Sequence, residues 1–378
     1  MITPVGNPML NVTSSAPADR LVAADGEPAK SRLGQLRQPS GLTVMIPAYN
    51  EAESIVDTVR SIQNQTIPPD EIIVIDDCSS DNTSELAAGA GATVLRLPKN
   101  SGTKAGAQNY ALAQIQTPYV MAVDADTTLE ANAIELLLAA IREPNISAAC
   151  GFVIPRHVKT IWERGRYMEY LFAFTFYKPI QDFYDHPLIS SGCFSIYRTE
   201  HLKANGGWST RTMAEDMDLT WSFYQAGRGV RFVPEAVCYP IEPHDRVLMG
   251  KQLKRWSHGF LQNVRIHWKG VLEVPFLRTS VFVALWDAIV ASFAYIVLMP
   301  LLAILFRNPL FLLGYLIDIP FVMIPAMVRG AQRGELLRTI ASLPSYLILR
   351  VFNGIYMMKA VWLEFVMQRP LRVYEKGH

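Results

Sequence analysis

The segment YVMAVDAD at residues 119–126 constrains the fold and chemistry of this chain more than any other segment. Its apolar run predicts a buried strand, which ends in two aspartates one residue apart, Asp124 and Asp126. Alternate side chains of an extended segment point the same way, so both carboxylates would leave the strand together. Hard carboxylate oxygens placed in this way suit Mg²⁺ or Mn²⁺, which also binds substrate phosphates. Because an Asp-x-Asp triplet is equally typical of a solvated loop, other segments must decide.

The composition limits the class of protein. Half of the 378 residues are apolar and only 18% are charged, below the usual fraction of about a quarter. The formal net charge of +1 argues against a nucleic-acid binder, which normally carries a basic excess. The four cysteines are scattered without a Cys-x-x-Cys pair, so neither a zinc site nor a disulfide framework is indicated. A reducing compartment is therefore the simpler expectation.

The composition also changes along the chain and predicts three parts. Residues 1–40 are rich in Pro, Ala, Ser and Gly without periodicity, and we expect a disordered leader. Residues 41–270 alternate between apolar strands and amphipathic helices. Residues 271–378 contain long apolar runs and are expected to form a membrane region.

Strands are expected at residues 42–50, 71–77, 92–97 and 119–126, with a Gly-rich loop (NSGTKAGAQ) before a helix at 110–116. This alternation predicts an α/β fold, a mostly parallel sheet with helices on both faces. Ligands of such sheets bind beyond the carboxyl ends of the strands. One rim should therefore gather the candidate residues Tyr49, Glu51, Asp76, Asp77, Lys104, Asp124 and Asp126.

The residue types at this rim suit a nucleotide. Asp76 or Asp77 could accept a hydrogen bond from a pyrimidine N–H, and Lys104 could offer a cation to a phosphate. Each also has a plainer explanation, because Asp76 and Asp77 could cap the next helix and Lys104 could be a solvated surface residue.

Four motifs in this order, IPAYNE, IDDCSSDNT, SGTKAGAQNYAL and VDAD, resemble the family 2 glycosyltransferases. The resemblance covers about residues 42–270 and implies a GT-A fold, a nucleotide-sugar donor and inversion at the sugar. In that family an acidic dipeptide supplies the general base, and Glu215–Asp216 matches it, with Asp216 as our choice. Taken alone, acids at a helix N-terminus are more often explained by the helix dipole.

Residues 252–256, QLKRW, match the Gln-x-x-Arg-Trp signature of membrane synthases such as those of cellulose, chitin and hyaluronan. On a helix, Gln252, Arg255 and Trp256 share one face. Arg255 could hold the diphosphate and Trp256 could stack on a sugar, although such a pair more often serves packing. Leu253 departs from the usual polar residue of processive synthases.

Residues 281–306 and 309–328 are each apolar and long enough to cross a bilayer. Asp287 and Asp318 should find partners away from lipid. The arginine-rich loop at 329–338 indicates the cytoplasmic side, which we also expect for the catalytic domain. We expect 339–368 to span as well; the alternative is an interfacial or re-entrant helix that keeps the basic tail inside.

These features predict a multi-pass enzyme of a bacterial-type cell membrane. It would be a metal-dependent, inverting glycosyltransferase that moves a sugar from a nucleotide-sugar, such as a UDP-sugar, to a polysaccharide or lipid-linked acceptor. Repeated addition, single transfer to a lipid and assembly into a homo-oligomer all stay open. Two alternatives belong to other classes: a catalytically dead membrane scaffold, and a haloacid dehalogenase-type phosphatase, whose nucleophile loop Asp124, Asp126 and Thr128 would match.

Overall fold

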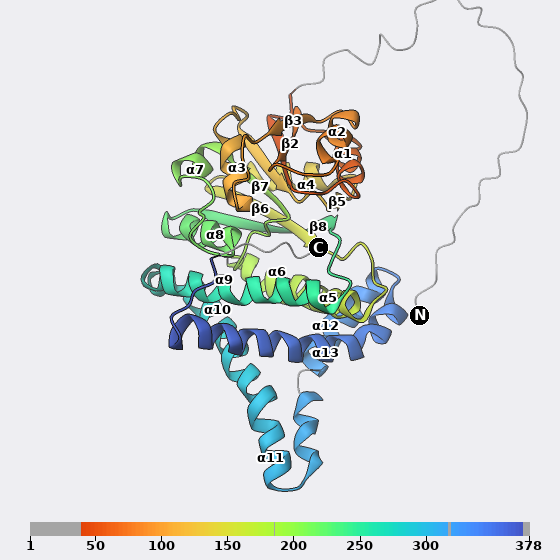
Figure 1. Ribbon diagram of the computed structural model, residues 1–378, viewed down its shortest axis with the longest axis vertical. Coiled ribbons are helices and arrows are strands. Elements are labelled where there is room, and N and C mark those ends of the chain that lie inside the picture. Colours follow the sequence, from red (N-terminus) through yellow and green to blue (C-terminus); the bar gives the residue numbers. More distant parts are fainter. Residues whose placement is uncertain (1–38, 185, 317–318, 373–378) are drawn as a thin grey trace, which may run out of the picture. The chain divides into compact units, whose positions relative to one another are not determined.

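The computed structural model describes residues 39–184, 186–316 and 319–372 (Figure 1), so nearly all of the expected leader lies outside the described residues. Within them, eight strands form one mixed sheet of order β3-β2-β1-β4-β7-β6-β8-β5. The strands are β1 Leu42–Ala48, β2 Glu71–Asp76, β3 Thr93–Arg96, β4 Tyr119–Val123, β5 Thr128–Leu129, β6 Ile146–Val153, β7 Phe194–Arg198 and β8 Gly229–Tyr239.

The sheet has a parallel half and a mixed half. β1 pairs in parallel with β2 and β4, and β2 with β3, which confirms the predicted parallel arrangement of these four strands. β7 runs antiparallel to β4 and β6, with Val123 opposite Phe194. This register brings the start of β7 beside the end of β4. Residues 192–193 therefore lie next to Asp124, and the backbone N–H of Asp124 donates to the Cys193 carbonyl over 3.2 Å.

Helices cover both faces of the sheet, because its central strands are apolar on both sides. Val44 and Ile46 of β1 belong to one buried cluster with α1 and α4, whereas Met45 belongs to a second with α3 and α8. The helices are α1 Ile55–Gln63, α2 Thr83–Gly89, α3 Lys104–Leu112, α4 Ala133–Ile141, α5 Ile161–Phe172, α6 Lys178–Phe183, α7 Thr199–Ala204, α8 Glu215–Gln225, α9 Arg246–Glu273, α10 Pro275–Leu285, α11 Met299–Leu305, α12 Ile319–Gln332 and α13 Leu336–Val361.

Helix α3 begins earlier than the sequence predicted. The loop NSGTKAGAQ was expected to extend to residue 108, but α3 already begins at Lys104. The cause is local, since the Thr103 hydroxyl accepts a hydrogen bond from the Gly106 N–H over 3.1 Å and caps the helix. The prediction of a loop here was wrong, and Lys104 occupies the first turn of a helix instead.

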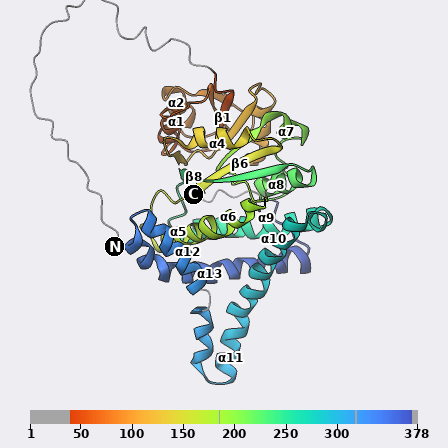
Figure 2. The ribbon, with the colours of Figure 1, turned by 180° about the vertical axis from the view of Figure 1, so that it is seen from behind.

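Two segments of the described chain are helical, long and apolar enough to cross a membrane: Pro275–Leu305 and Pro309–Gln332. Only 11% and 13% of their most apolar windows are buried, unlike the core helix of a soluble protein. The first segment includes the short helices η2 Trp286–Ala291 and η3 Ala294–Leu298, and the second begins with η4 Pro309–Leu316. Two further short helices, η1 Ala173–Tyr177 and η5 Trp362–Val366, lie outside these segments. Figures 1 and 2 show this hairpin leading away from the sheet, while α9 and α13 run side by side beneath it.

The aspartate in the first of these segments, Asp287, has a polar partner, as expected for a carboxylate kept away from lipid. The Arg350 guanidinium of α13 donates to both Asp287 oxygens, one of them over 2.9 Å. Asp318 lies outside the described residues. The domain boundary expected at residue 270 falls inside α9, three residues before the helix ends at Glu273.

Candidate active site

A series of side-chain and backbone contacts through Lys104 and Gly192 connects the end of β4 with the start of α8. Lys104 forms an ion pair with the Asp124 carboxylate and donates from its Nζ to the Gly192 carbonyl over 2.9 Å. The Gly192 N–H donates to Oδ2 of Asp216 over 2.8 Å. Three predicted site residues from three separate elements are thus connected by consecutive contacts. The contacts connect Asp124 with Asp216 through Lys104 and Gly192, and the predicted approach of Asp124, Asp126, Asp216 and Arg255 to one site stays a prediction.

Asp216 and its neighbour Glu215 lie in different surroundings at the first turn of α8. Glu215 is only 7% exposed, and burial, followed by the negative charge of Asp216, raises the pKa of its carboxyl. The charges of Lys104 and Arg255 oppose that shift, so both cations lie within electrostatic reach of Glu215. Asp216 is the more exposed of the two acids, and its second oxygen accepts from the Met217 N–H over 2.8 Å. Asp216 is therefore the better placed to meet an acceptor.

Asp126 faces a more enclosed environment than Asp124. It is 5% exposed, and its Oδ1 accepts from the Thr127 hydroxyl over 2.9 Å. Its backbone carbonyl accepts from Arg156 over 2.7 Å, an arginine that sequence reasoning had not singled out. Asp124 keeps a third of its side chain exposed. The pair therefore offers one accessible and one sheltered carboxylate at the end of the same strand.

The carboxylates after β2 are already engaged by their own loops. The buried Asp76 accepts from the backbone of Ser79 over 2.8 Å and from the Ser84 hydroxyl, and pairs with Arg96 over 3.2 Å. Burial would raise the pKa of Asp76, but these hydrogen bonds and the arginine charge outweigh it and lower the pKa. The predicted hydrogen bond from a pyrimidine N–H to Asp76 stays a prediction.

Asp77 organises the loop that precedes α3. It accepts from the backbone N–H of Ser101 over 2.6 Å and from the Ser101 hydroxyl over 2.8 Å. The loop after β1 brings Tyr49 and Glu51 to the same rim; Tyr49 is 44% exposed, and the buried Glu51 accepts from Ser54 over 3.1 Å. All four residues lie where the strand order predicted, beyond the carboxyl ends of β1 and β2.

The Gln252–Trp256 motif contacts a buried arginine, Arg166, that was not among the predicted site residues. Arg166 of α5 is fully buried, donates to the Gln252 side chain over 2.6 Å, and lies 4.4 Å from the centre of the Trp256 ring. It also pairs with Glu169 and, over 3.5 Å, with the buried Glu242. One face of the ring predicted to stack on a sugar is thus covered by Arg166, and Gln252 ties α9 to α5.

The donor set at the end of β4 fits a cation that takes most of its ligands from a substrate. Among the described residues, no three His, Cys, Asp or Glu side chains gather closely enough to enclose a metal. Two carboxylates, Asp124 and Asp126, are nevertheless what Mg²⁺ or Mn²⁺ uses when phosphate oxygens and water complete its shell. The residues present therefore fit a substrate-shared metal and not a protein-enclosed one.

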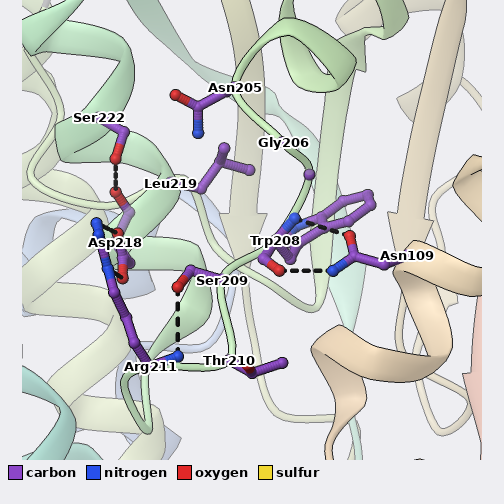
Figure 3. A pocket seen from close by; sticks show the side chains of 11 residues that line it. Asn109, Asn205, Gly206, Trp208, Ser209, Thr210, Arg211, Asp218, Leu219 and Ser222 are labelled. Carbon is purple, nitrogen blue, oxygen red and sulfur yellow. Dashed lines mark hydrogen bonds and ion pairs between the residues drawn. The ribbon is translucent and has the colours of Figure 1, made fainter.

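A hollow of about 460 Å³ lies beside the candidate site but contains none of its predicted residues (Figure 3). Its lining includes Trp208, Arg211 and Asp218; the Trp208 backbone is held by Asn109, and Arg211 binds both oxygens of Asp218 over 2.7 and 2.8 Å. His267 also contacts Asp218, over 2.9 Å. These bonds hold α8 in place two residues beyond Asp216.

A mixed sheet of this order, with two acids ending a central strand and a second acidic pair opening α8, is similar to the GT-A fold. The mannosyltransferase PcManGT from Pyrobaculum calidifontis, solved with GDP-Man and Mn²⁺, has this fold. It matches 89% of this chain and 92% of its own at 19% identity, with a TM-score of 0.55. Residues 43–206 match the model of the family described as Glycosyl transferase family 2. This part of the chain therefore carries a domain similar to that family.

Curated relatives agree with this assignment. The poly-beta-1,6-N-acetyl-D-glucosamine synthase of Staphylococcus epidermidis is 29% identical over 228 residues, 59% of this chain and 55% of that protein. The synthase of the same name from Staphylococcus aureus strain COL is 29% identical over 224 residues, 58% of this chain and 54% of that protein. The chain thus spans about half the length of these relatives. The family model ends before Glu215, so the roles of Asp216 and Arg255 rest on the geometry.

Proposed function

We propose that this chain is a membrane-bound, inverting glycosyltransferase that moves a sugar from a nucleoside diphosphate, a UDP-sugar first of all, to a glycan or lipid-linked acceptor. The observation that carries the proposal is the series of contacts through Lys104 and Gly192 that connects Asp124 with Asp216. A donor-side and an acceptor-side acid linked in this way suit a single displacement at an anomeric carbon.

In the proposed reaction Asp216 accepts the proton of the acceptor hydroxyl as its oxygen attacks the anomeric carbon. The new carbon–oxygen bond forms as the bond to the diphosphate breaks, and the nucleoside diphosphate leaves with that electron pair. The Gly192 N–H holds one Asp216 oxygen and so orients the other side of the carboxylate. Lys104 and Arg255 place positive charge beside this acid pair, where a leaving diphosphate would gain from it.

Asp124 and Asp126 are the residues that would hold a divalent metal. When bound, Mg²⁺ or Mn²⁺ would neutralise charge on the diphosphate and help it to leave. Lys104 forms an ion pair with Asp124 at this position. Tyr49, Glu51, Asp76 and Asp77 would line the nucleotide side of the same rim.

The two apolar helices support attachment to a cell membrane with the catalytic domain on the cytoplasmic side, where nucleotide-sugars are made. The curated relatives are named for making an N-acetylglucosamine polymer, so UDP-N-acetylglucosamine is the first donor to test. Product length separates the two modes of action: chains of many sugars require repeated addition, whereas single-sugar products indicate one transfer to a lipid or glycan.

The experiment is a screen of UDP-sugars with the full chain in detergent, with Mg²⁺, Mn²⁺ or a chelator. We expect UDP release from at least one donor, dependent on the metal and inverted at the anomeric carbon of the product. No release from any nucleotide-sugar would contradict the proposal. Phosphate release from a simple phosphate ester, without any sugar donor, would favour the phosphatase alternative instead.

A further inference from the structure

Lys178 is a buried lysine to which the proposed reaction assigns no role. It is the first residue of α6, which packs against β8, and it is only 5% exposed. Within the described part of the chain, its ammonium contacts a hydroxyl, a thiol and two aromatic rings, and no ion pair there includes it. Burial of an ammonium without a carboxylate partner is unfavourable, so this position needs an explanation.

The ammonium of Lys178 is directed at the segment that precedes β7. Its Nζ donates to the Ser191 hydroxyl over 3.0 Å and to the Cys150 sulfur over 3.4 Å. It also lies 4.6 Å from the centre of the Phe174 ring and 5.4 Å from that of Phe232, and these ring faces favour a cation. Of these contacts, the charge-assisted hydrogen bond to the Ser191 oxygen is the strongest kind. The lysine therefore acts on Ser191 above all.

The segment around Ser191 is also fixed by contacts with β7 and α8. The Ser195 hydroxyl of β7 donates to the Ser191 carbonyl over 2.7 Å. The Ser190 N–H donates to the Thr220 hydroxyl of α8 over 2.9 Å. That hydroxyl in turn donates to the Asp216 carbonyl over 2.6 Å. The lysine from α6, the strand β7 and the helix α8 thus hold this short segment from three elements.

Gly192 follows Ser191 and makes the two backbone contacts on which the candidate site depends. Its N–H donates to Asp216 and its carbonyl accepts from Lys104. The Ser191 carbonyl and the Gly192 N–H belong to one planar peptide unit, so the position of Ser191 sets the direction of that N–H. Gly192 has no side chain with which to fix this peptide itself. A displaced Ser191 would therefore turn the N–H away from Asp216.

We propose that Lys178 is a positioning residue for the general base. Its ammonium fixes Ser191, and through the shared peptide it fixes the Gly192 N–H that holds one oxygen of Asp216. This inference rests on the proposed function, because it concerns the rate of the transfer step. A carboxylate held in one orientation meets the acceptor hydroxyl in the productive geometry more often, which lowers the barrier. Lys178 therefore contributes to the turnover number and not to donor binding.

The test compares Lys178→Met, Ser191→Ala and the double variant, each as the full chain in detergent with the UDP-sugar on which the unmodified chain is most active. Methionine fills a similar space beside the rings and replaces a buried charge with an apolar group, so the fold should be kept. We expect Lys178→Met to lower the turnover number by about 10- to 100-fold. The KM for the donor should stay within about twofold of the unmodified chain.

Ser191→Ala removes the same hydrogen bond from its other end and should also lower the turnover number. The double variant should then be within about threefold of the slower single variant, because both substitutions break one contact. The matched control is Lys203→Met. The exposed Lys203 of α7 donates to the Ile115 carbonyl over 2.6 Å, so this change also removes a lysine hydrogen bond, but on another element. Its turnover number should stay within about twofold of the unmodified chain.

An unchanged turnover number per folded molecule in Lys178→Met would show that the lysine only supports the fold, and would overturn the inference. An unchanged turnover number in Ser191→Ala would overturn it as well, and this result decides alone should Lys178→Met fail to fold. A double variant whose loss equals the product of the two single losses would show that the two residues act independently, which also overturns it. Absence of UDP release by the unmodified chain with every donor would instead remove the proposed function, and the inference with it, so the two failures are distinguishable.

Discussion

The donor side of the site and the helices beneath it depend on different kinds of contact. On the donor side, Asp76 ends β2, Asp77 follows it and Asp124 follows β4. These two strands flank β1, so the positions of the three acids come from the order of the sheet. Beneath it, α5, α9 and α13 are joined by buried polar groups far apart in sequence, such as Arg166 with Gln252 and Glu364 with His258. Substitutions of site residues should therefore lower the rate of the reaction. Substitutions of the buried polar groups in α5, α9 and α13 should first lower the stability of the fold.

The largest expected effect is on the general base. Asp216→Asn should lower the transfer rate by about 10²- to 10⁴-fold, because the amide cannot take the acceptor's proton. Donor binding, measured by titration with the nucleotide-sugar, should be nearly unchanged. Glu215→Gln is the matched control and should lose less, since Glu215 is buried and Asp216 is the more exposed acid. A larger loss of transfer rate in Glu215→Gln than in Asp216→Asn would identify Glu215 as the general base instead.

The buried arginine tests the other side of the comparison. Arg166→Met should lower the free energy of unfolding by about 3–5 kcal/mol, because it leaves the buried Glu242 without its cation. Denaturant unfolding in detergent measures this. The control Arg338→Met removes an exposed ion pair with Glu335 and should cost no more than about 1 kcal/mol. Equal losses of unfolding free energy in the two variants would show that the buried contacts of Arg166 stabilise the fold no more than an exposed ion pair does.

Gly192 should sharpen the comparison, because it contacts Asp216 directly and is connected to Asp124 through Lys104. A Cβ at this position would lie 3.0 Å from Oδ2 of Asp216, so Gly192→Ala should displace the carboxylate and lower the turnover number by about tenfold. Stability should change little. Gly89→Ala, at the end of α2 with nothing within 4 Å of the new Cβ, is the control and should keep full activity. An unchanged turnover number in the Gly192 variant would mean that Gly192 does not position Asp216.

The smallest effect concerns pH. The pKa of Glu215 is raised in the folded chain, first by burial and then by Asp216, so the folded state holds this proton to a higher pH than the unfolded state. The free energy of unfolding then falls as pH rises from about 4.3, the unfolded pKa, through the raised folded value. Glu215→Gln removes this term, so its stability relative to the unmodified chain should rise across that window. If the free energies of unfolding of Glu215→Gln and of the unmodified chain ran parallel from about pH 4 to 8, the raised pKa of Glu215 would be contradicted.

The sequence predicted the donor side well because strand ends and acid pairs are local signals. The strands before Asp76 and Asp124 are continuous apolar runs, and the carboxyl ends of parallel strands meet at one edge. The start of α3 at Lys104 was not predicted, because the glycines on both sides of Thr103 favoured a loop over a helix capped by that residue. Lys104 nevertheless reaches the site from a helix N-terminus.

The remaining contacts could not be predicted, because they depend on long-range packing. Arg166 lies within a sequence with several charged residues, and nothing local distinguishes the one that becomes fully buried. The segment 339–368 was expected to span the membrane, and the sequence did not indicate the contacts of Glu364 with α9 and of Asn353 with α5. The two hydrogen bonds of Gly192 follow from the register of β4 with β7.

The most direct test of the account is a double-mutant cycle between Asp124 and Asp216, with Asn at each position and in both. The rate of nucleoside diphosphate release is measured with one active donor, above the enzyme-free rate. If the two acids serve one displacement through Gly192, the double variant should be within about threefold of the slower single variant. A loss equal to the product of the two single losses would show that the acids act independently, and the single site would be contradicted.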